Sequence, residues 1–281
     1  MTGHSALARV LRTPRGGIAA AVLVVLVLGA VFAPLVAPYG YADQNLPMAN
    51  REPSLAHWLG TDEFGRDLLS RIIFGARTSL AVGTVSIGLS MLAGIVLGAA
   101  SGYFGGALDR AVTSVVDLTW SFPEILIALI LIAIVGPGLN STAIAIAIGY
   151  LAQFTRLTRA QIMSLRGETY VEATVGLGAT HAHVLFRHLL PNAITPVIVA
   201  GMLATGNAIV LEATLGFFGL GAQPPTPSWG AMMSSGTAQI FIAPWIIVFP
   251  GLAIAITVIA INLFGDALIE ALDIRSRLRS G

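Results

Sequence analysis

Long runs without a single charged residue constrain the fold of this chain more than any other feature. Each run is at least as long as the roughly 20 apolar residues that a helix needs to cross the bilayer core. Charged residues make up only 10% of the chain, which is too few to cover a water-facing surface. The sequence therefore predicts an all-α membrane protein. The uncharged runs are residues 16–42, 78–108, 125–155, 188–211 and 213–265.

Helix-breaking residues divide these runs into six expected membrane spans. The third run is too long for one helix and is interrupted by "GPGLN" at 136–140, and the last is interrupted by the proline-rich "GAQPPTPSWG". If the first span were a cleaved signal sequence, five would remain, but its apolar core exceeds the 7–15 residues of a signal peptide. The expected spans are about 17–38, 79–101, 116–135, 141–160, 188–211 and 245–265.

Arginine sets the expected orientation, because cytoplasmic segments of membrane proteins carry the excess of positive charge. Placing the N-terminus inside puts eleven arginines in the cytoplasm and four outside. We therefore expect a multi-pass protein of a bacterial inner or plasma membrane with both termini cytoplasmic. The expected parts are an N-terminal tail at 1–16, a first span at 17–38, an external segment at 39–77, a core domain at 78–265 and a C-terminal tail at 266–281.

The external segment at 39–77 is too long and too polar to be a simple turn. Within "GTDEFGRDLLSRIIFGARTSL", the spacing of Phe64, Leu68 and Ile72 predicts an amphipathic helix. The helix is interpreted either as a docking surface for an external partner or as a passive interfacial helix. We expect Asp62 to be its N-cap, Gly75 its stop, and Asp67 and Arg71 an exposed i,i+4 ion pair.

A second external segment, at 213–243, contains Gly216, Gly219 and Gly221, which permit tight turns, and three prolines, which prevent a continuous helix. Broken backbone near the membrane is tolerated where it is buried in protein or lines a wet cavity. We interpret this gate segment as a re-entrant or external gate, and an ordinary loop is the alternative. Its candidate gate residues are Pro224, Pro225 and Trp229.

Two carboxylates near the ends of predicted spans, Glu124 and Glu212, are candidate residues of the pathway or gate. The alternative is that both are boundary residues that reach for lipid headgroups. A proton-coupled carrier would need His or Arg partners near the middle of other spans, whereas the expected spans carry these residues only toward their cytoplasmic ends. This pattern counts against a secondary transporter.

The cytoplasmic loop between the fourth and fifth expected spans, "YVEATVGLGATHAHVLFRHLLPN", carries start and stop signals of short helices. Thr169 and Glu172 have the spacing of a capping box, and Gly178 is suited to end the helix that they begin. Thr180 can cap a second helix, which Pro191 punctuates before the fifth span. The three histidines of the loop do not fall on one helix face, so no metal site is predicted.

The chain contains no lysine and no cysteine. A P-loop needs a lysine to reach the phosphates, so this chain cannot bind ATP in that way. A cysteine nucleophile and a thiolate metal site are also excluded. Energy for any active transport must therefore come from another subunit.

The same loop resembles the EAA motif of bacterial ABC-importer permeases, E-A-A-x3-G-x9-I-x-L-P. Two positions depart from it, with Thr174 in place of the second alanine and His188 in place of the isoleucine. The resemblance implies that residues near 169–178 form a coupling helix that docks on an ATPase. The residues implied in this coupling are Thr169, Glu172, Ala173, Thr174, Gly178, Leu190 and Pro191.

Further stretches resemble the second permease of dipeptide, oligopeptide and nickel importers, the DppC/OppC type. They include "HWLGTDEFGRDLLSRIIFGARTSL", "SFPEILIALILIAIVGPGL" and "GFFGLGAQPPTPSWGAMM". The resemblance implies a six-helix, type I ABC-importer transmembrane domain that is not itself an enzyme. The implied partners are a homologous B-type permease, two cytoplasmic ATPase subunits that use ATP and Mg, an extracytoplasmic solute-binding protein and membrane lipid, without nucleic acid or a cofactor bound to this chain.

The resemblance leaves the cargo open between peptides and nickel or another small solute, and we favour di- or oligopeptides. Two rival classes make different predictions. A secondary transporter or channel would work without any ATPase. A membrane-embedded enzyme would need a nucleophile and base in register or a metal cluster, whereas no histidine lies in the interior of an expected span.

Overall fold

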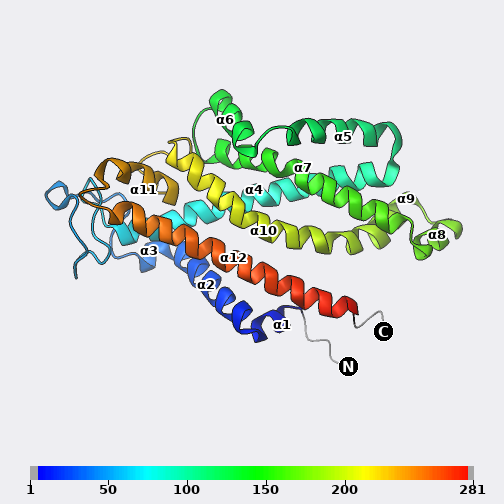
Figure 1. Cartoon of the computed structure of the whole chain (residues 1–281), viewed down its shortest axis with the longest axis horizontal. Coiled ribbons are helices and arrows are strands. Elements are labelled where there is room, and N and C mark those ends of the chain that lie inside the picture. Colours follow the sequence, from blue (N-terminus) through cyan, green and yellow to red (C-terminus); the bar gives the residue numbers. More distant parts are fainter. Residues whose placement is uncertain (1–5, 278–281) are drawn as a thin grey trace. The chain divides into compact units, whose positions relative to one another are not determined.

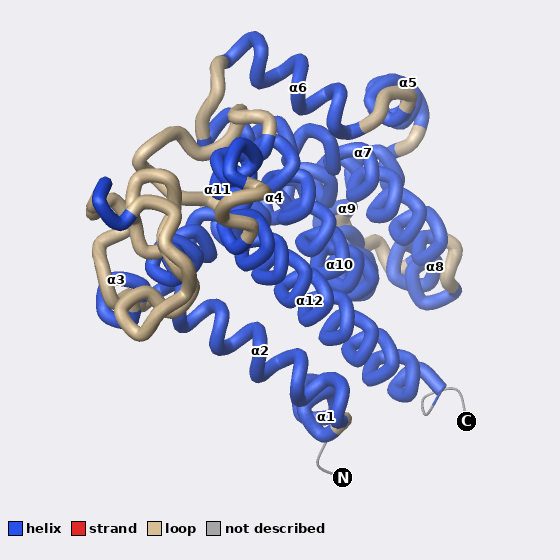
Figure 2. Tube along the Cα trace, turned by 60° about the vertical axis from the view of Figure 1, so that its left-hand side comes forward, coloured by secondary structure: helices blue, strands red, loops and turns tan. Residues whose placement is uncertain are grey.

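The computed structural model describes the backbone of residues 6–277 and the side chains of residues 8–272. Helices dominate this part of the chain, and Figures 1 and 2 show no strand in it. The expected C-terminal tail therefore lies partly outside the described residues, as does the start of the N-terminal tail. The elements are α1 (Ala6–Arg12), α2 (Pro14–Val31), α3 (Ala33–Val36), η1 (Leu46–Met48), α4 (Leu68–Phe104), α5 (Gly106–Trp120), α6 (Glu124–Val135), α7 (Leu139–Arg166), α8 (Thr169–Gly176), α9 (His181–His183), η2 (Val184–Leu189), α10 (Leu190–Phe217), α11 (Trp229–Gly236), η3 (Thr237–Gln239) and α12 (Trp245–Arg277).

Among the described residues, four helical stretches are long and apolar enough to cross a membrane: Pro14–Val31, Leu68–Phe104, His181–Phe217 and Trp245–Leu272. A bent pair, α5 with α6, would make a fifth. The predicted count of six is therefore not reproduced. The expected fourth span corresponds to α7, whose C-terminal half carries Arg156, Arg159 and Arg166 and is too polar to be counted.

The chain is divided into two compact units. The described part of unit 1 covers residues 6–84, 132–143 and 202–277, and unit 2 covers residues 85–131 and 144–201. The long helices α4 and α10 each pass from one unit into the other.

In unit 1, α2 runs alongside α12, and the short helix α1 packs against both (Figure 1). Val10 of α1 meets Ala267 and Ala271 of α12 in a small buried cluster. Thr13 is the N-cap of α2 and accepts a hydrogen bond from the amide of Gly16 at 3.1 Å. At the other end, Pro34 cannot supply the amide that would continue the helix, so α2 ends at Val31 and α3 follows as a separate turn.

The separate amphipathic helix predicted for the first external segment is wrong. One helix, α4, begins at Leu68 and continues through Gly75 to Phe104. The carboxylate of Asp67, not that of Asp62, accepts from the amide of Ser70 at 2.8 Å at its start. Gly75 is not a stop but a contact residue, because a Cβ atom there would lie 3.2 Å from Cδ1 of Trp229.

The predicted exposed ion pair between Asp67 and Arg71 is also wrong. Arg71 is buried and pairs with Asp62 at 3.3 Å, and Asp62 also binds Nε of Arg66 at 2.6 Å. Asp67 instead contacts Nδ1 of His57 at 2.9 Å. The residues before α4 thus form a folded, hydrogen-bonded loop, because buried charges need partners. Figure 2 shows this loop among the tan segments near α3 and α11.

In unit 2, a row of glycines brings α4 against α7. Gly94, Gly98 and Gly102 lie one turn apart, and a Cβ atom at these positions would come within 2.5, 2.4 and 2.9 Å of the facing helix. The facing atoms belong to Phe154, Thr155 and Arg159. Close approach of backbones at small residues is the usual way in which helices associate in membranes.

The third expected span is not one straight helix. Its two halves, α5 and α6, are bent by 93° at residues 121–123. Pro123 explains the break, because it lacks an amide hydrogen and disfavours a helical conformation at the residue before it. The predicted interruption at 136–140 is present: α6 ends at Val135, Gly136 and Gly138 have φ values of 97° and 153°, and α7 begins at Leu139.

Candidate functional site

The loop that we predict to be cytoplasmic begins with α8, and the predicted capping box is absent from the start of this helix. The N-cap of α8 is Glu168, in extended conformation, and Thr169 is the first helical residue. The backbone carbonyl of Glu168 accepts from the amides of Val171 and Glu172. Glu172 therefore lies in the first turn, where its carboxylate interacts favourably with the positive end of the helix dipole.

The predicted stop at Gly178 is confirmed in detail. Its φ of 82° lies in the left-handed region that glycine adopts without strain. The amide of Gly178 donates to the carbonyl of Val175 at 2.9 Å, and the amide of Ala179 donates to the carbonyl of Thr174 at 3.3 Å. This pair of bonds is a Schellman motif, which satisfies the last carbonyls of α8 and gives the helix a defined end.

Beyond the stop, Thr180 caps α9 as predicted and accepts from the amide of His183 at 3.3 Å. The prediction that Pro191 interrupts the chain before the fifth span is wrong. α9 leads through η2, a π-helical turn at Val184–Leu189, directly into α10, whose first two residues are Leu190 and Pro191. A wider turn before the proline accommodates its ring and its missing amide hydrogen without ending the helix.

One face of α8 is anchored in unit 2, and the other is free. Val171 is buried with Val184, Leu189, Ile162 and Tyr103 in one apolar cluster. Three apolar side chains of α8 and its C-cap are exposed instead, and Leu177 is 90% exposed. An exposed apolar surface on a short helix with fixed ends is typical of a docking element. The three exposed side chains are Tyr170, Val175 and Leu177.

Two polar contacts tie this loop to the end of α4. The hydroxyl of Tyr103 lies 2.8 Å from Nδ1 of His181, and Arg166 of α7 donates from Nη1 to the carbonyl of Tyr103 at 3.0 Å. Sequence reasoning missed both, because no local pattern connects Tyr103 with a histidine 78 residues later.

The gate candidates Glu212 and Trp229 come together in unit 1. Trp229, the first residue of α11, is fully buried, and its indole donates to the carbonyl of Ile72 at 3.1 Å. Its amide donates to Oγ of Ser79 at 3.3 Å. Glu212 is also fully buried, and the side chains of Ser79 and Ser228 lie next to its carboxyl group.

Pro224 and Pro225 lie on the wall of a pocket of about 480 Å³. Glu63, Arg66 and Arg71 of the first external segment line the same pocket. The two prolines are exposed, so the structure separates them from the buried pair Glu212 and Trp229.

The remaining candidate, Glu124, belongs to unit 2, where it lies beside Tyr150 of α7. It is therefore not part of the cluster around Glu212. Nearby in the sequence, Asp117 forms an ion pair with Arg156, whose guanidinium lies 3.8 Å from the centre of the Trp120 ring. This arrangement was also not predicted.

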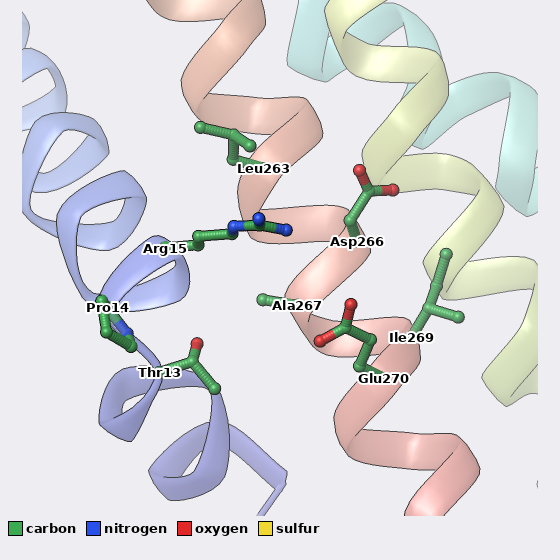
Figure 3. Close-up of a pocket in the computed structure, with 8 residues that line it drawn as sticks. All are labelled: Thr13, Pro14, Arg15, Leu263, Asp266, Ala267, Ile269 and Glu270. Atoms are coloured by element: carbon green, nitrogen blue, oxygen red, sulfur yellow. The ribbon is translucent and has the colours of Figure 1, made fainter.

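A pocket of about 560 Å³ lies between the start of α2 and α12 (Figure 3). Arg15 extends from α2 toward α12, which contributes Asp266 and Glu270.

Comparison with known proteins identifies the family. Residues 94–278 match the family described as binding-protein-dependent transport system inner membrane component, and residues 3–53 match the N-terminal TM domain of oligopeptide transport permease C. The chain is 42% identical over 247 residues to the dipeptide transport system permease protein DppC of Alkalihalophilus pseudofirmus, covering 88% of this chain and 81% of that protein. It is 41% identical over 260 residues to the glutathione transport system permease protein GsiD of Pectobacterium atrosepticum, covering 91% and 86%.

Solved structures agree on the fold. The MetNI methionine ABC transporter in an inward-facing conformation matches with a TM-score of 0.58 and 22% identity over 73% of this chain and 97% of that chain. An amino acid ABC transporter matches with a TM-score of 0.56 and 16% identity over 71% of this chain and 92% of that chain. The chain has the all-helical fold of type I ABC-importer transmembrane domains, and it belongs to the family of inner membrane components of binding-protein-dependent transport systems.

Proposed function

We propose that this chain is a permease subunit of an ATP-driven importer of di- or oligopeptides. Relatives at 42% and 41% identity are named as dipeptide and glutathione permeases, and glutathione is itself a peptide. The same permease role for nickel or another small solute is the alternative. We expect neither catalysis nor a bound cofactor in this chain, and the absence of lysine excludes a P-loop for ATP.

The observation that carries the coupling role is α8, a short helix with fixed ends and an exposed apolar face. Val171 of α8 is buried against Val184 and Leu189 of the π-helical turn, which leads from α9 directly into α10, although a turn at 177–180 separates α8 from α9. A push on α8 would therefore be passed to α10 through this buried apolar cluster. Leu177 and its apolar neighbours would dock into a cleft of the ATPase, which uses ATP and Mg.

The proposed complex holds this chain, a homologous B-type permease, two cytoplasmic ATPase subunits and an extracytoplasmic solute-binding protein. Both termini and α8 would face the cytoplasm, as the arginine distribution indicates. The external segment and the gate segment would then face the binding protein. ATP-driven closure of the ATPases would move α8 and switch the pathway from inward to outward access.

Replacement of one exposed side chain tests the docking role. Leu177→Asp leaves the core of unit 2 intact, because Leu177 is 90% exposed, but it places a charge on the proposed docking face. We expect at least about a tenfold loss of co-purified ATPase and of peptide uptake, since a buried unpaired charge costs more than 1.4 kcal/mol. Leu55→Asp, at a 97% exposed position of the external segment, is the matched control and should keep the ATPase bound. Undiminished ATPase binding in Leu177→Asp would refute the coupling role of α8.

A further inference from the structure

Glu212 combines complete burial with the absence of a charged partner. Its side chain is 0% exposed, and neither carboxylate oxygen has a hydrogen-bond partner within residues 8–272. Burying an ionised carboxylate without a counter-charge is so costly that the group takes up a proton instead. The position of Glu212, one turn before the end of α10, places this group directly beneath the gate segment.

The groups that face the carboxyl come from α4 and from the gate segment, and they are uncharged. α4 contributes Ser79, the gate segment contributes Ser228, and the backbone around Gly221 closes the space, with a Cβ there 3.9 Å from Oε1 of Glu212. Among the described side chains, no arginine or histidine interacts with the carboxyl group of Glu212. The carboxyl therefore sits in a neutral, polar environment rather than in an ion-pair network.

Both serines also hold α11, the helix of the gate segment. Oγ of Ser79 accepts from the amide of Trp229, and Oγ of Ser228 caps α11 by accepting from the amide of Ala231 at 3.4 Å. Each hydroxyl still has a hydrogen to donate. A neutral carboxylic acid can accept from these hydroxyls and donate its own proton, whereas an ionised carboxylate can only accept.

The contact between α11 and α10 leaves no room for a hydrated charge. A Cβ atom at Gly230 would lie 2.1 Å from the carbonyl oxygen of Ala213, and one at Gly216 would lie 3.2 Å from Oγ of Ser228. The backbones of α10 and α11 therefore touch beside Glu212. Water could reach the carboxyl only if α11 moved away.

We propose that Glu212 is a neutral carboxylic acid that positions α11 against α4 and α10, and that it exchanges its proton when the gate segment opens. In the closed state the acid keeps its proton. When α11 lifts, water solvates the carboxyl, and the proton passes to the solvent. High pH therefore favours the open state, and closing takes up one proton. This inference rests on the proposed role of residues 213–243 as a gate.

The absence of cysteine from the chain allows a direct test of opening. Met232 of α11 is 2% exposed, and its sulfur would lie 3.6 Å from a Cβ atom at Gly75 of α4. In Met232→Cys, the new cysteine is the only thiol of this chain. It is shielded while α11 packs against α4 and reacts with a water-soluble maleimide when α11 lifts. The assembled transporter in lipid nanodiscs, without ATP or binding protein, is labelled at about pH 6.5 and about pH 8.5 with and without Glu212→Gln.

Glutamine is neutral at every pH and keeps a donor and an acceptor. The labelling rate with Glu212 is divided by the rate with Glu212→Gln at the same pH. Because both proteins carry the same thiol, this ratio cancels the pH dependence of the thiol itself. We expect this ratio of labelling rates to be near one at the lower pH and about five or more at the higher pH. Glu52→Gln is the matched control, because Glu52 is exposed and should show no such change.

Two results would overturn the proposal: a flat ratio across the pH range, or faster labelling in Glu212→Gln at the lower pH. ATP-driven peptide uptake provides the second readout. Glu212→Gln should retain at least about half of the uptake, whereas a charged residue of the pathway would lose most of it. Failure of the proposed transport function would appear differently, as absent uptake in the unsubstituted protein with the labelling pattern intact.

Discussion

The amide of Ala179 donates a hydrogen bond to the carbonyl of Thr174 at 3.3 Å, and this contact requires the left-handed backbone of the glycine between them. Two glycines close to this point offer a matched comparison. Gly178 has a φ of 82°, whereas Gly176 is helical, and a Cβ atom at either would meet nothing within 4 Å. The two positions therefore differ in backbone conformation and not in available space.

Gly178→Ala should weaken the end of α8, because a side chain in the left-handed region costs roughly 1–2 kcal/mol. We expect faster hydrogen exchange at the amides of Gly178 and Ala179 and a lower yield of co-purified ATPase. Gly176→Ala should leave both unchanged or slightly improved, since alanine favours the helix. Equal effects of the two substitutions would show that the Schellman motif does not matter for docking.

The glycine row of α4 predicts a second matched pair, in unit 2. A Cβ atom at Gly98 would lie 2.4 Å from the carbonyl oxygen of Thr155, while one at Gly88 on the same helix would meet nothing within 4 Å. Gly98→Val should destabilise the protein by about 1–3 kcal/mol or more, because overpacking forces the backbones apart. Gly88→Val should change the free energy of unfolding by less than about 1 kcal/mol. Thermal unfolding in detergent measures both, and similar melting temperatures for the two variants would contradict the close approach of α4 and α7.

Several local signals predicted the conformation correctly, although the local capping box expected at Thr169 and Glu172 is absent. The break at Gly136 and Gly138, the stop at Gly178 and the cap at Thr180 depend on backbone angles and on neighbouring amides. Such features can be predicted because the residues that cause them lie within one turn of their effect.

Predictions failed where a distant segment decides. Gly75 looks like a helix stop, but α4 continues because the ring of Trp229 packs on that glycine from more than 150 residues away. Arg71 pairs with Asp62 rather than Asp67 because the preceding loop folds back and buries all three. Similarly, the setting of Glu212 between two serines required the tertiary structure.

The start of α4 provides a third prediction. Asp67 is buried and accepts from the amide and hydroxyl of Ser70 at 2.8 and 2.7 Å and contacts His57 at 2.9 Å. Asp67→Ala removes the cap and leaves buried donors unpaired, so we expect a loss of about 2–4 kcal/mol in unfolding free energy. Asp43 makes a comparable turn contact to the amide of Gly40 at 2.9 Å, but that contact is exposed. Asp43→Ala should therefore cost less than about 1 kcal/mol. Denaturation in mild detergent distinguishes the two, and a loss as small in Asp67→Ala as in the control would exclude its capping role.

The anchoring of α11 provides the last prediction. The indole of Trp229 is fully buried and donates to the carbonyl of Ile72 at 3.1 Å, so Trp229→Phe removes a buried donor and leaves that carbonyl without it. We expect a loss of about 1–3 kcal/mol and increased protease sensitivity of the gate segment, because α11 would be held less firmly against α4. Trp58 carries the same side chain but is 68% exposed, so Trp58→Phe should change neither property. If limited proteolysis cuts residues 213–243 at the same rate in both variants, the indole hydrogen bond does not hold the gate segment closed.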